Sequence, residues 1–308
     1  MISRRRFVAL ASVASFLAQW PTRRGAAAAE LRFPFEHCKR WGYLRSDGSI
    51  VVSPRFMNAT TYSDGLAAIQ IDGRWGYVDA DGRVVIAPRF DEARYFHDGL
   101  SPVRVGSLWG FIDRSGTLAI RPRFDSARSF VERRARVFTG GKWGFIGLDG
   151  EYTVKPAYDG ANGYGSGLAP VQSGDAWGFI DHAGHVVLPF RYPMAASFKE
   201  DRAAVQIGGR YGFIDPSGAT VIAPAFDAAG EFGEGCCPVQ QGDMWRYIDT
   251  TGAPALSATF GRAGAFAGGL APVAIDGTDA YINRSGTIVW KGESGCCTSA
   301  PFGNTTAP

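Results

Sequence analysis

The sequence lacks the common catalytic motifs and is poor in residues that carry enzyme chemistry. No Gly-x-Ser-x-Gly nucleophile elbow, phosphate-binding loop or His-Glu-x-x-His zinc motif occurs in its 308 residues. The four histidines share no spacing: His37, His97, His182 and His185. His182 and His185 flank a turn glycine without a third ligand nearby in the sequence, so we expect exposed turn residues. These absences predict a protein that is not an enzyme, with no catalytic residue, cofactor or metal site.

Long apolar segments are also missing. After residue 29 no run reaches the roughly 18 apolar residues that a spanning helix needs, so we expect no transmembrane segment in the mature chain. Residues 3–8, Ser-Arg-Arg-Arg-Phe-Val, resemble the twin-arginine export motif, and a short apolar run and five small residues at 25–29 follow. We predict a cleaved twin-arginine-type signal peptide over 1–29 and a periplasmic or secreted protein. The alternatives are an uncleaved membrane anchor and a basic start that arose by chance.

A real excess of positive charge is absent as well. The whole chain carries a formal net charge of +3, but residues 1–29 hold five arginines and no acid. Removing these five from the 32 basic residues leaves 27 against 29 acidic residues, a formal charge of −2. A mature chain of this charge has no electrostatic footprint for nucleic acid, and we expect no nucleic-acid partner.

Cysteine is scarce, with Cys38 and two adjacent pairs, Cys236-Cys237 and Cys296-Cys297. Their spacing fits no zinc or redox motif. Neighbouring cysteines fit the geometry of a disulfide poorly, so one prediction is a bond between the two pairs that ties the C-terminal tail to the repeats. The other is that Cys236 and Cys237 are small buried residues, since they occupy the places of Leu168 and Ala169 in another repeat.

What the sequence does contain is a 34-residue repeat in eight copies. Positions are counted here from its first residue. That residue is a tryptophan in six units: Trp41, Trp75, Trp109, Trp143, Trp177 and Trp245. Position +7 is glycine in all eight: Gly48, Gly82, Gly116, Gly150, Gly184, Gly218, Gly252 and Gly286. The sixth unit begins with Tyr211, and the eighth begins with Asp279.

The residues around this glycine predict a β-hairpin. Position +4 is Asp or Asn in six units, and an Asp three residues before a Gly is typical of a type I turn that ends in a left-handed residue. This capping role explains Asp79, Asp113, Asp181 and Asp215 without catalysis. Aromatic and β-branched residues on both sides favour strands. A third strand opens with Gly-Leu-Ala-Pro-Val, as in residues 167–171. No window has helical periodicity, which excludes a helical 34-residue repeat.

Each unit is therefore expected to be three strands and one ordered link, in an all-β tandem array of eight units. A three-stranded meander cannot bury both faces alone, so the units should stack, with the tryptophans in a column. We predict an open β-solenoid or superhelix, because propeller blades usually have four strands in about 40–45 residues. A closed propeller-like ring is the alternative.

The repeat resembles the WG β-repeat family, also written KWG. The matching pattern is Trp-Gly-(Tyr/Phe)-(Ile/Val)-Asp-x-x-Gly, followed by (Val/Ile)-x-Pro-x-(Phe/Tyr)-Asp, as in residues 86–91. The resemblance gives a WG β-repeat domain of eight repeats over 30–292 and a C-terminal tail over 293–308. It implies no shared enzymatic activity.

Two binding hypotheses follow. The first is an exported scaffold that binds an unidentified protein partner in the periplasm or cell envelope, because repeat arrays offer long surfaces. The second is a carbohydrate- or peptidoglycan-binding module, which needs exposed tryptophans. The single charge anomaly is the basic run Arg133, Arg134 and Arg136, which could meet an acidic partner or lipid head groups but is expected at a solvated edge.

Overall fold

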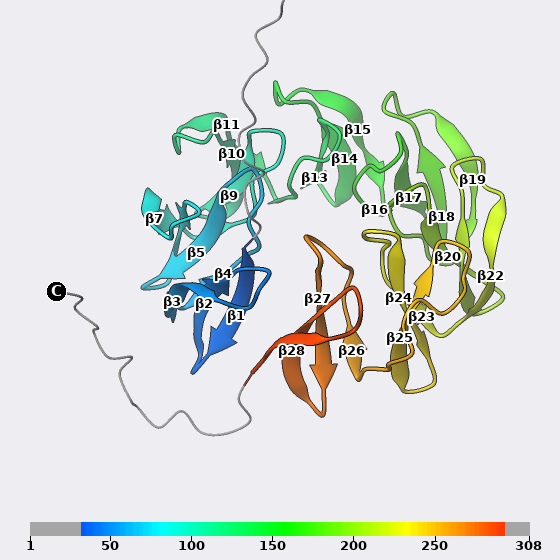
Figure 1. Ribbon diagram of the computed structural model, residues 1–308. Helices are drawn as coiled ribbons and strands as arrows, with labels where there is room; N and C mark the ends of the chain where they lie inside the picture. The colour runs from blue at the N-terminus through cyan, green and yellow to red at the C-terminus, as the bar shows by residue number, and fades with distance from the viewer. Residues whose placement is uncertain (1–31, 293–308) are drawn as a thin grey trace, which may run out of the picture. The chain divides into compact units, whose positions relative to one another are not determined.

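A computed structural model describes residues 32–292 of the chain. Within this range the structure is all-β, as predicted, and its strands form eight antiparallel sheets arranged as the blades of a ring (Figure 1). None of the described segments is a helix with the length and apolarity to cross a membrane. The signal peptide predicted over 1–29 and the tail over 293–308 lie outside the described residues.

The blades follow one another in chain order. Blade 1 holds β1 (Phe33–His37), β2 (Arg40–Leu44) and β3 (Ile50–Phe56). Blade 2 holds β4 (Asn58–Ala59), β5 (Ala67–Ile71), β6 (Arg74–Val78) and β7 (Val84–Phe90). Blade 3 holds β8 (Glu92–Ala93), β9 (Ser101–Val105), β10 (Leu108–Ile112) and β11 (Leu118–Phe124). Blade 4 holds β12 (Ser126–Ala127), β13 (Ala135–Thr139), β14 (Lys142–Ile146) and β15 (Tyr152–Tyr158).

The second half repeats this pattern. Blade 5 holds β16 (Gly160–Ala161), β17 (Ala169–Ser173), β18 (Ala176–Ile180) and β19 (Val186–Tyr192). Blade 6 holds β20 (Ala203–Ile207), β21 (Arg210–Ile214) and β22 (Thr220–Phe226). Blade 7 holds β23 (Ala228–Ala229), β24 (Cys236–Gln241) and β25 (Met244–Asp249). Blade 8 holds β26 (Arg262–Ala263), β27 (Leu270–Ile275), β28 (Thr278–Asn283) and β29 (Ile288–Lys291).

Most blades have one strand more than the sequence predicts. The link after the proline contains a two-residue strand, such as β4, which pairs with β5 through Asn58 and Ala59. In blade 6 the isolated bridge Ala195–Val205 takes the same place. A blade also differs from a sequence unit, because β4 and β5 come before Trp75 and β6 and β7 come after it. Each blade thus joins the second half of one unit to the first half of the next.

The hairpin turn has the predicted chemistry. The glycines at +7 all have positive φ, between 78° and 90°. Asp113 Oδ1 accepts hydrogen bonds from the backbone N–H groups of Ser115 at 2.9 Å and Thr117 at 3.0 Å. In the fourth unit, where Gly147 replaces this aspartate, Asp149 accepts from a backbone N–H instead. These side chains satisfy turn amides, which explains their recurrence without a catalytic role.

The aromatic residues that join the blades are those at +2 and +21, and not the tryptophans. Each ring at +2 lies in one blade and meets the ring at +21 of the next blade, with centroids 4.7–5.1 Å apart. The pairs are Tyr43–Tyr62, Tyr77–Phe96, Phe111–Phe130, Phe145–Tyr164, Phe179–Phe198, Phe213–Phe232 and Tyr247–Phe266. No ring pair joins two tryptophans of residues 32–292, so the expected tryptophan column is wrong. Burial of each inter-blade ring contributes roughly 1.5–3 kcal/mol to stability.

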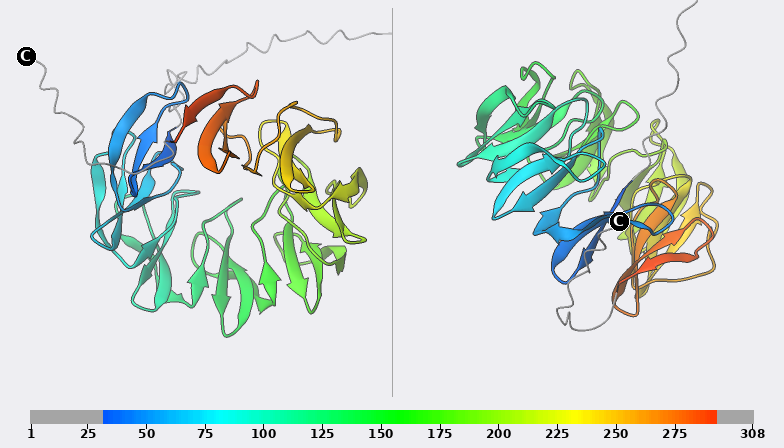
Figure 2. Two further views of the ribbon diagram at one scale, coloured as in Figure 1. Left: turned by 90° about the horizontal axis from the view of Figure 1, so that it is seen from below. Right: turned by 60° about the vertical axis from the view of Figure 1, so that its left-hand side comes forward.

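The ring is closed, and the predicted open solenoid is wrong. The first blade lies beside the last blade in both views (Figures 1 and 2). Tyr281 of blade 8 packs edge-on against Phe33 of blade 1 at 5.5 Å, and its hydroxyl donates to the carbonyl of Pro34 at 2.8 Å. Phe35 meets Trp290 in the same seam. Closure needs no exchanged strand among the described residues, because the +2 aromatic of blade 8 contacts blade 1 much as it would a following blade.

Candidate functional site

A cavity of about 270 Å³ lies where the inner segments of five consecutive blades converge. Its walls come from residues between Arg94 in blade 3 and Glu231 in blade 7. One cavity can touch so many blades because it faces the centre of the ring. Its cationic residues define the arginine pocket: Arg94, Arg128, Arg134, Arg136 and Lys199.

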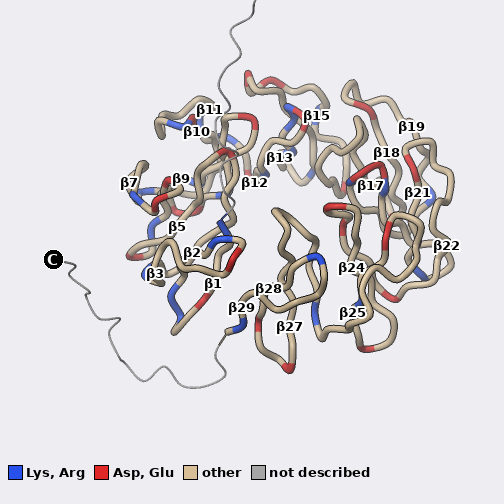
Figure 3. The backbone as a smooth tube through the Cα atoms, in the orientation of Figure 1, with Lys and Arg blue, Asp and Glu red and all other residues tan. Residues whose placement is uncertain are grey.

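Short inner strands position these side chains. Arg94 follows β8 and Arg128 follows β12, so both begin the segment that runs along the inside of the ring. Arg136 lies on β13, which pairs with β12, and Arg134 comes just before β13 (Figure 3 marks the basic positions beside this strand in blue). Two neighbouring blades thus bring four guanidinium groups to the cavity.

Aromatic faces and neutral acceptors hold the guanidinium groups. Arg128 and Arg136 both lie over the ring of Trp143, at 5.8 Å and 5.7 Å from its centroid, and Arg94 lies over Trp109 at 4.9 Å. Arg136 Nη1 donates to Asn162 Oδ1 at 2.7 Å. A stacked guanidinium keeps its edge free for other partners.

The pocket is short of negative charge. Among its lining residues Glu231 is the single carboxylate, and none of the five cations forms an ion pair with a carboxylate in residues 32–292. Burial, together with the charge of Arg128, lowers the pKa of Arg136 to about 10. The same two causes lower the pKa of Arg94. Both shifts show that positive charge is concentrated here against an energetic cost.

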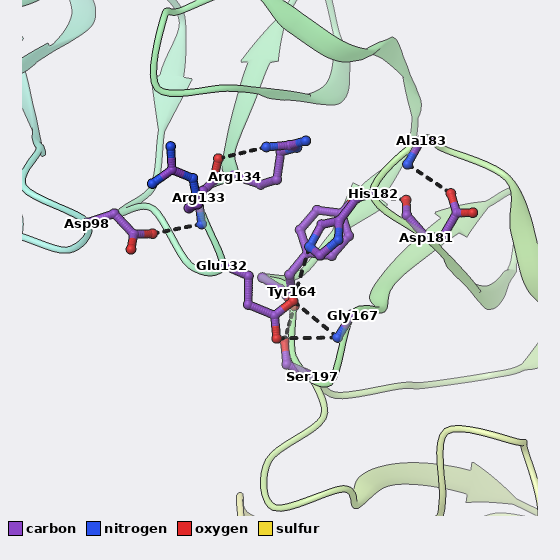
Figure 4. A network of polar contacts seen from close by, with 11 residues as sticks. Asp98, Glu132, Arg133, Arg134, Tyr164, Gly167, Asp181, His182, Ala183 and Ser197 are labelled. Carbon is purple, nitrogen blue, oxygen red and sulfur yellow. Dashed lines mark hydrogen bonds and ion pairs between the residues drawn. The ribbon is translucent and has the colours of Figure 1, made fainter. Parts of the chain in front are cut away.

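A belt of acidic side chains lies close by but serves another purpose (Figure 4). These residues stand at +23, and each accepts a hydrogen bond from a backbone N–H at +24 of the next unit. Asp98 accepts from Arg133 N at 2.8 Å, and Glu132 accepts from Gly167 N at 3.1 Å. Asp64, Glu200 and Glu234 make the corresponding bonds. The belt therefore links neighbouring blades.

The histidines that the sequence singled out do not converge. His182 Nε2 lies 3.1 Å from Glu132 Oε2, and its ring lies 4.4 Å from that of Tyr164. His185 Nδ1 lies 3.1 Å from a different carboxylate, that of Asp181. The described residues contain no group of three His, Cys, Asp or Glu side chains arranged to hold a metal ion.

The cysteines divide into two kinds. Cys236 and Cys237 are free thiols that are buried in the core, so the bond that the sequence suggested between this pair and the tail is not formed. Burial raises the pKa of both thiols, which opposes thiolate chemistry. Cys38 is disulfide-bonded, and Cys296 and Cys297 lie outside the described residues.

The basic run is placed only partly as expected. Arg133 is exposed, as a solvated edge requires, whereas Arg134 and Arg136 are half-buried and line the pocket. Neither Arg94 nor Arg128 was among the residues predicted from the sequence. The available signal was a departure from the repeat, because +19 is Gly, Ala, Thr or Asn in the other units where it lines the ring.

These features define the class of the protein: an eight-bladed β-propeller with a cation-lined cavity at its centre. A family model described as "WG containing repeat" matches residues 41–75, 75–109, 109–143, 143–175, 177–211, 211–245 and 245–278. The chain therefore belongs to the WG-repeat family, as the resemblance predicted. No curated protein matches the chain by sequence.

Several solved propeller structures share the fold at low sequence identity. One is "Dihydro-heme d1 dehydrogenase NirN in complex with DHE", with a TM-score of 0.58, 13% identity, and coverage of 89% of this chain and 76% of that chain. Another is "Crystal structure of the eukaryotic initiation factor", with a TM-score of 0.53, 10% identity, and coverage of 88% and 86%. Hsv2p of Kluyveromyces lactis has a TM-score of 0.52, 7% identity, and coverage of 73% and 92%. At these identities the likeness concerns the fold alone.

Proposed function

We propose that the protein is a non-catalytic, exported scaffold that binds another protein in the periplasm or cell envelope. The observation that carries this proposal is an apolar rim at the outer edge of the ring. The outermost strand of a blade pairs on one side only, which leaves a free backbone edge. Exposed apolar residues lie on these strands: Ile50, Val84, Val85, Leu118, Val186, Val187, Val221 and Ile288.

Such a rim is suited to protein contact. Val85 and Val187 are 49% and 47% exposed, although the next residues of the same strands, Ile86 and Leu188, are buried. Repeated apolar side chains beside open strand edges favour association with another chain, either side to side or by strand addition. Export is supported by the order of basic, apolar and small residues in the first 29 positions.

The test is affinity capture from the envelope fraction with wild-type protein and a rim variant. The variant replaces Val84, Val85, Val186 and Val187 with threonine, which keeps β propensity and removes apolar surface. The control replaces the adjacent exposed residues Arg83 and His185 with glutamine. We expect wild type and control to retain the same partner and the rim variant to lose it. Equal retention by all three, or no retained protein at several salt concentrations, would refute the proposal.

Glycan binding is the second candidate function, and one cavity of the ring supports it. Glycan binding was expected to need exposed tryptophans, but all six signature tryptophans are buried or half-buried. The seam between blades 8 and 1, however, has a cavity of about 800 Å³ lined by Trp41, Tyr281 and Trp290. Acrylamide quenching of tryptophan fluorescence with and without cell-wall glycan fragments tests it, since a bound sugar should shield these rings.

A further inference from the structure

We propose that the arginine pocket is a binding site for a small phosphate-class oxyanion, either free or as a phosphate ester. This inference goes beyond the proposed protein scaffold and does not depend on it, because the pocket lies inside the ring and the apolar rim lies outside. It rests on three features of the pocket: its charge, its unused hydrogen-bond donors and its size.

The charge of the pocket calls for an anion. Five cationic side chains face a cavity that has one carboxylate, Glu231, in its lining. Arg128 and Arg136 stack over the same indole, that of Trp143, although their charges repel one another. The carboxylates at +23 accept hydrogen bonds from backbone N–H groups and form no ion pair with the five cations among the described residues. Like charges held together at partly buried positions are stabilised when a multivalent anion binds between them.

Some guanidinium N–H donors of the pocket have no hydrogen-bond partner within residues 32–292, whereas the neutral polar side chains in its walls already form hydrogen bonds within the protein. The Nε atoms of Arg94 and Arg134 are buried and have no hydrogen-bond partner among the described residues. The hydroxyl of Ser129 donates to the carbonyl of Tyr95 at 2.7 Å. Asn162 accepts from Arg136 and donates to the carbonyl of Ala195 at 3.1 Å. One Nη1 donor of each of Arg128, Arg134 and Arg136 already bonds a protein acceptor. The remaining guanidinium N–H groups are the donors that the pocket offers to a ligand that only accepts hydrogen bonds.

Size and geometry select the class of anion. A cavity of about 270 Å³ is small for a drug-sized ligand but has room for a phosphate and a short organic group. Its guanidinium groups approach from blades 3 and 4, and Lys199 approaches from the segment that leads into blade 6. A tetrahedral dianion presents oxygens in several directions, which suits donors on several walls better than a planar carboxylate does.

The test is calorimetric titration of the full chain with inorganic phosphate at constant ionic strength. We expect saturable binding at one site per chain. Glycerol 3-phosphate and vesicles that contain phosphatidylglycerol form two further arms, which distinguish a soluble ester from a lipid head group as the source of the phosphate. No saturable binding in any arm up to about 10 mM phosphate groups would overturn the proposal, as would equal binding of acetate.

Three variants connect binding to the pocket. The double variant Arg128→Gln and Arg136→Gln should bind phosphate about tenfold more weakly or worse, the loss expected for one or two charge-assisted hydrogen bonds. Asn162→Asp keeps the side-chain shape and the acceptor for Arg136, loses the donor to the carbonyl of Ala195 and adds a competing negative charge, so it should also weaken binding. Arg133→Gln, in the exposed position of the same basic run, should bind as wild type does.

A loss of phosphate binding can be distinguished from a loss of folding. Thermal unfolding of each variant shows whether it is folded, and Asn162→Asp serves if the double arginine variant is not. Unchanged phosphate affinity in a folded Asn162→Asp variant, or the same loss in Arg133→Gln as in the double variant, would contradict a site in the arginine pocket. Because no protein partner takes part, failure here leaves the scaffold proposal intact.

Discussion

At the scale of single residues, the glycine that follows five of the six signature tryptophans is required by the neighbouring strand. A Cβ atom on Gly110 would lie 2.5 Å from the carbonyl oxygen of Ile120 and 2.7 Å from the nitrogen of Pro122. Both atoms belong to the backbone of β11, where the register shifts opposite this glycine. The backbone of the bulged strand therefore lies too close to this position for any residue with a Cβ atom, and only glycine fits.

Substitution of this glycine should be costly. We expect Gly110→Ala to destabilise the protein by about 1–3 kcal/mol, because the backbone of β11 must move to admit a methyl group. The control is Gly261→Ala, where the nearest atom is the carbonyl oxygen of Ala274 at 3.7 Å and φ is not positive. Denaturant unfolding of both variants measures the difference. Equal midpoints would show that the close approach in the structure is not limiting.

At this scale the sequence predicted structural residues better than functional ones. The positive φ at Gly82 and the capping by Asp79 follow from local turn chemistry, so a short window of sequence determines them. Arg94 and Arg136 are 42 residues apart, and they share a cavity only because two blades lie side by side. No local pattern encodes that proximity.

At the scale of the element, the hairpin turn makes stability depend on pH. A hydroxyl at +6 donates to the aspartate at +4, from Ser115 to Asp113 at 2.6 Å and from Ser217 to Asp215 at 2.6 Å. These hydrogen bonds are the main reason that the pKa of both carboxyls lies below its usual value. The folded state then binds fewer protons than the unfolded state, so this stabilisation is present at neutral pH and is lost as the pH falls through the lowered pKa.

Asparagine at these positions should remove the titration and keep the turn. In the eighth unit Asn283 already accepts the equivalent bond from the Ser285 hydroxyl at 2.7 Å, and bonds from the backbone N–H groups of Ser285 and Thr287. We expect the Tm of an Asp113→Asn and Asp215→Asn variant to fall less than that of wild type between pH 7 and about pH 3. Calorimetric scans across this range measure the effect. Asp175→Asn, at an exposed turn outside this motif, is the control and should follow wild type.

The innermost strand shows the limit of prediction for elements. The sequence predicted three strands per unit and an ordered link that contains no strand. The link instead holds a two-residue strand and a tight turn at residues such as Asp64-Gly65, which both have positive φ. Two adjacent left-handed residues of the type Asp-Gly are a recognised hairpin signal, so the turn could have been predicted. The strand itself is too short for any periodicity to show.

At the scale of the whole molecule, closure depends on a contact between distant parts of the chain. Tyr281 and Pro34 are 247 positions apart in sequence, yet they share a hydrogen bond. The repeat period describes how one unit meets the next, and that local relation is compatible with both a stack and a ring. The small rotation between blades decides the outcome, and the sequence of one unit does not state it.

Weakening the seam should loosen the ring at its two ends first. We expect Tyr281→Ala to lower stability by about 2–4 kcal/mol, since it removes both the contact with Phe33 and the bond to Pro34. Amide hydrogen exchange should accelerate in β1 and β28 more than in blades 4 and 5. Tyr152→Ala, at an exposed site far from the seam, is the control. Uniform acceleration around the ring would contradict a local seam.

The half-unit offset between sequence repeat and blade determines which duplications and truncations of the chain leave every sheet complete. Each of the first seven 34-residue segments contributes to two adjacent sheets, so consecutive sheets are joined by the covalent chain as well as by side chains. Duplication of one segment would supply the inner half of one sheet and the outer half of another, and every sheet would stay whole. A chain that ends at the boundary between two segments would instead end on the inner strands of a sheet and leave that sheet half-built, with an exposed edge.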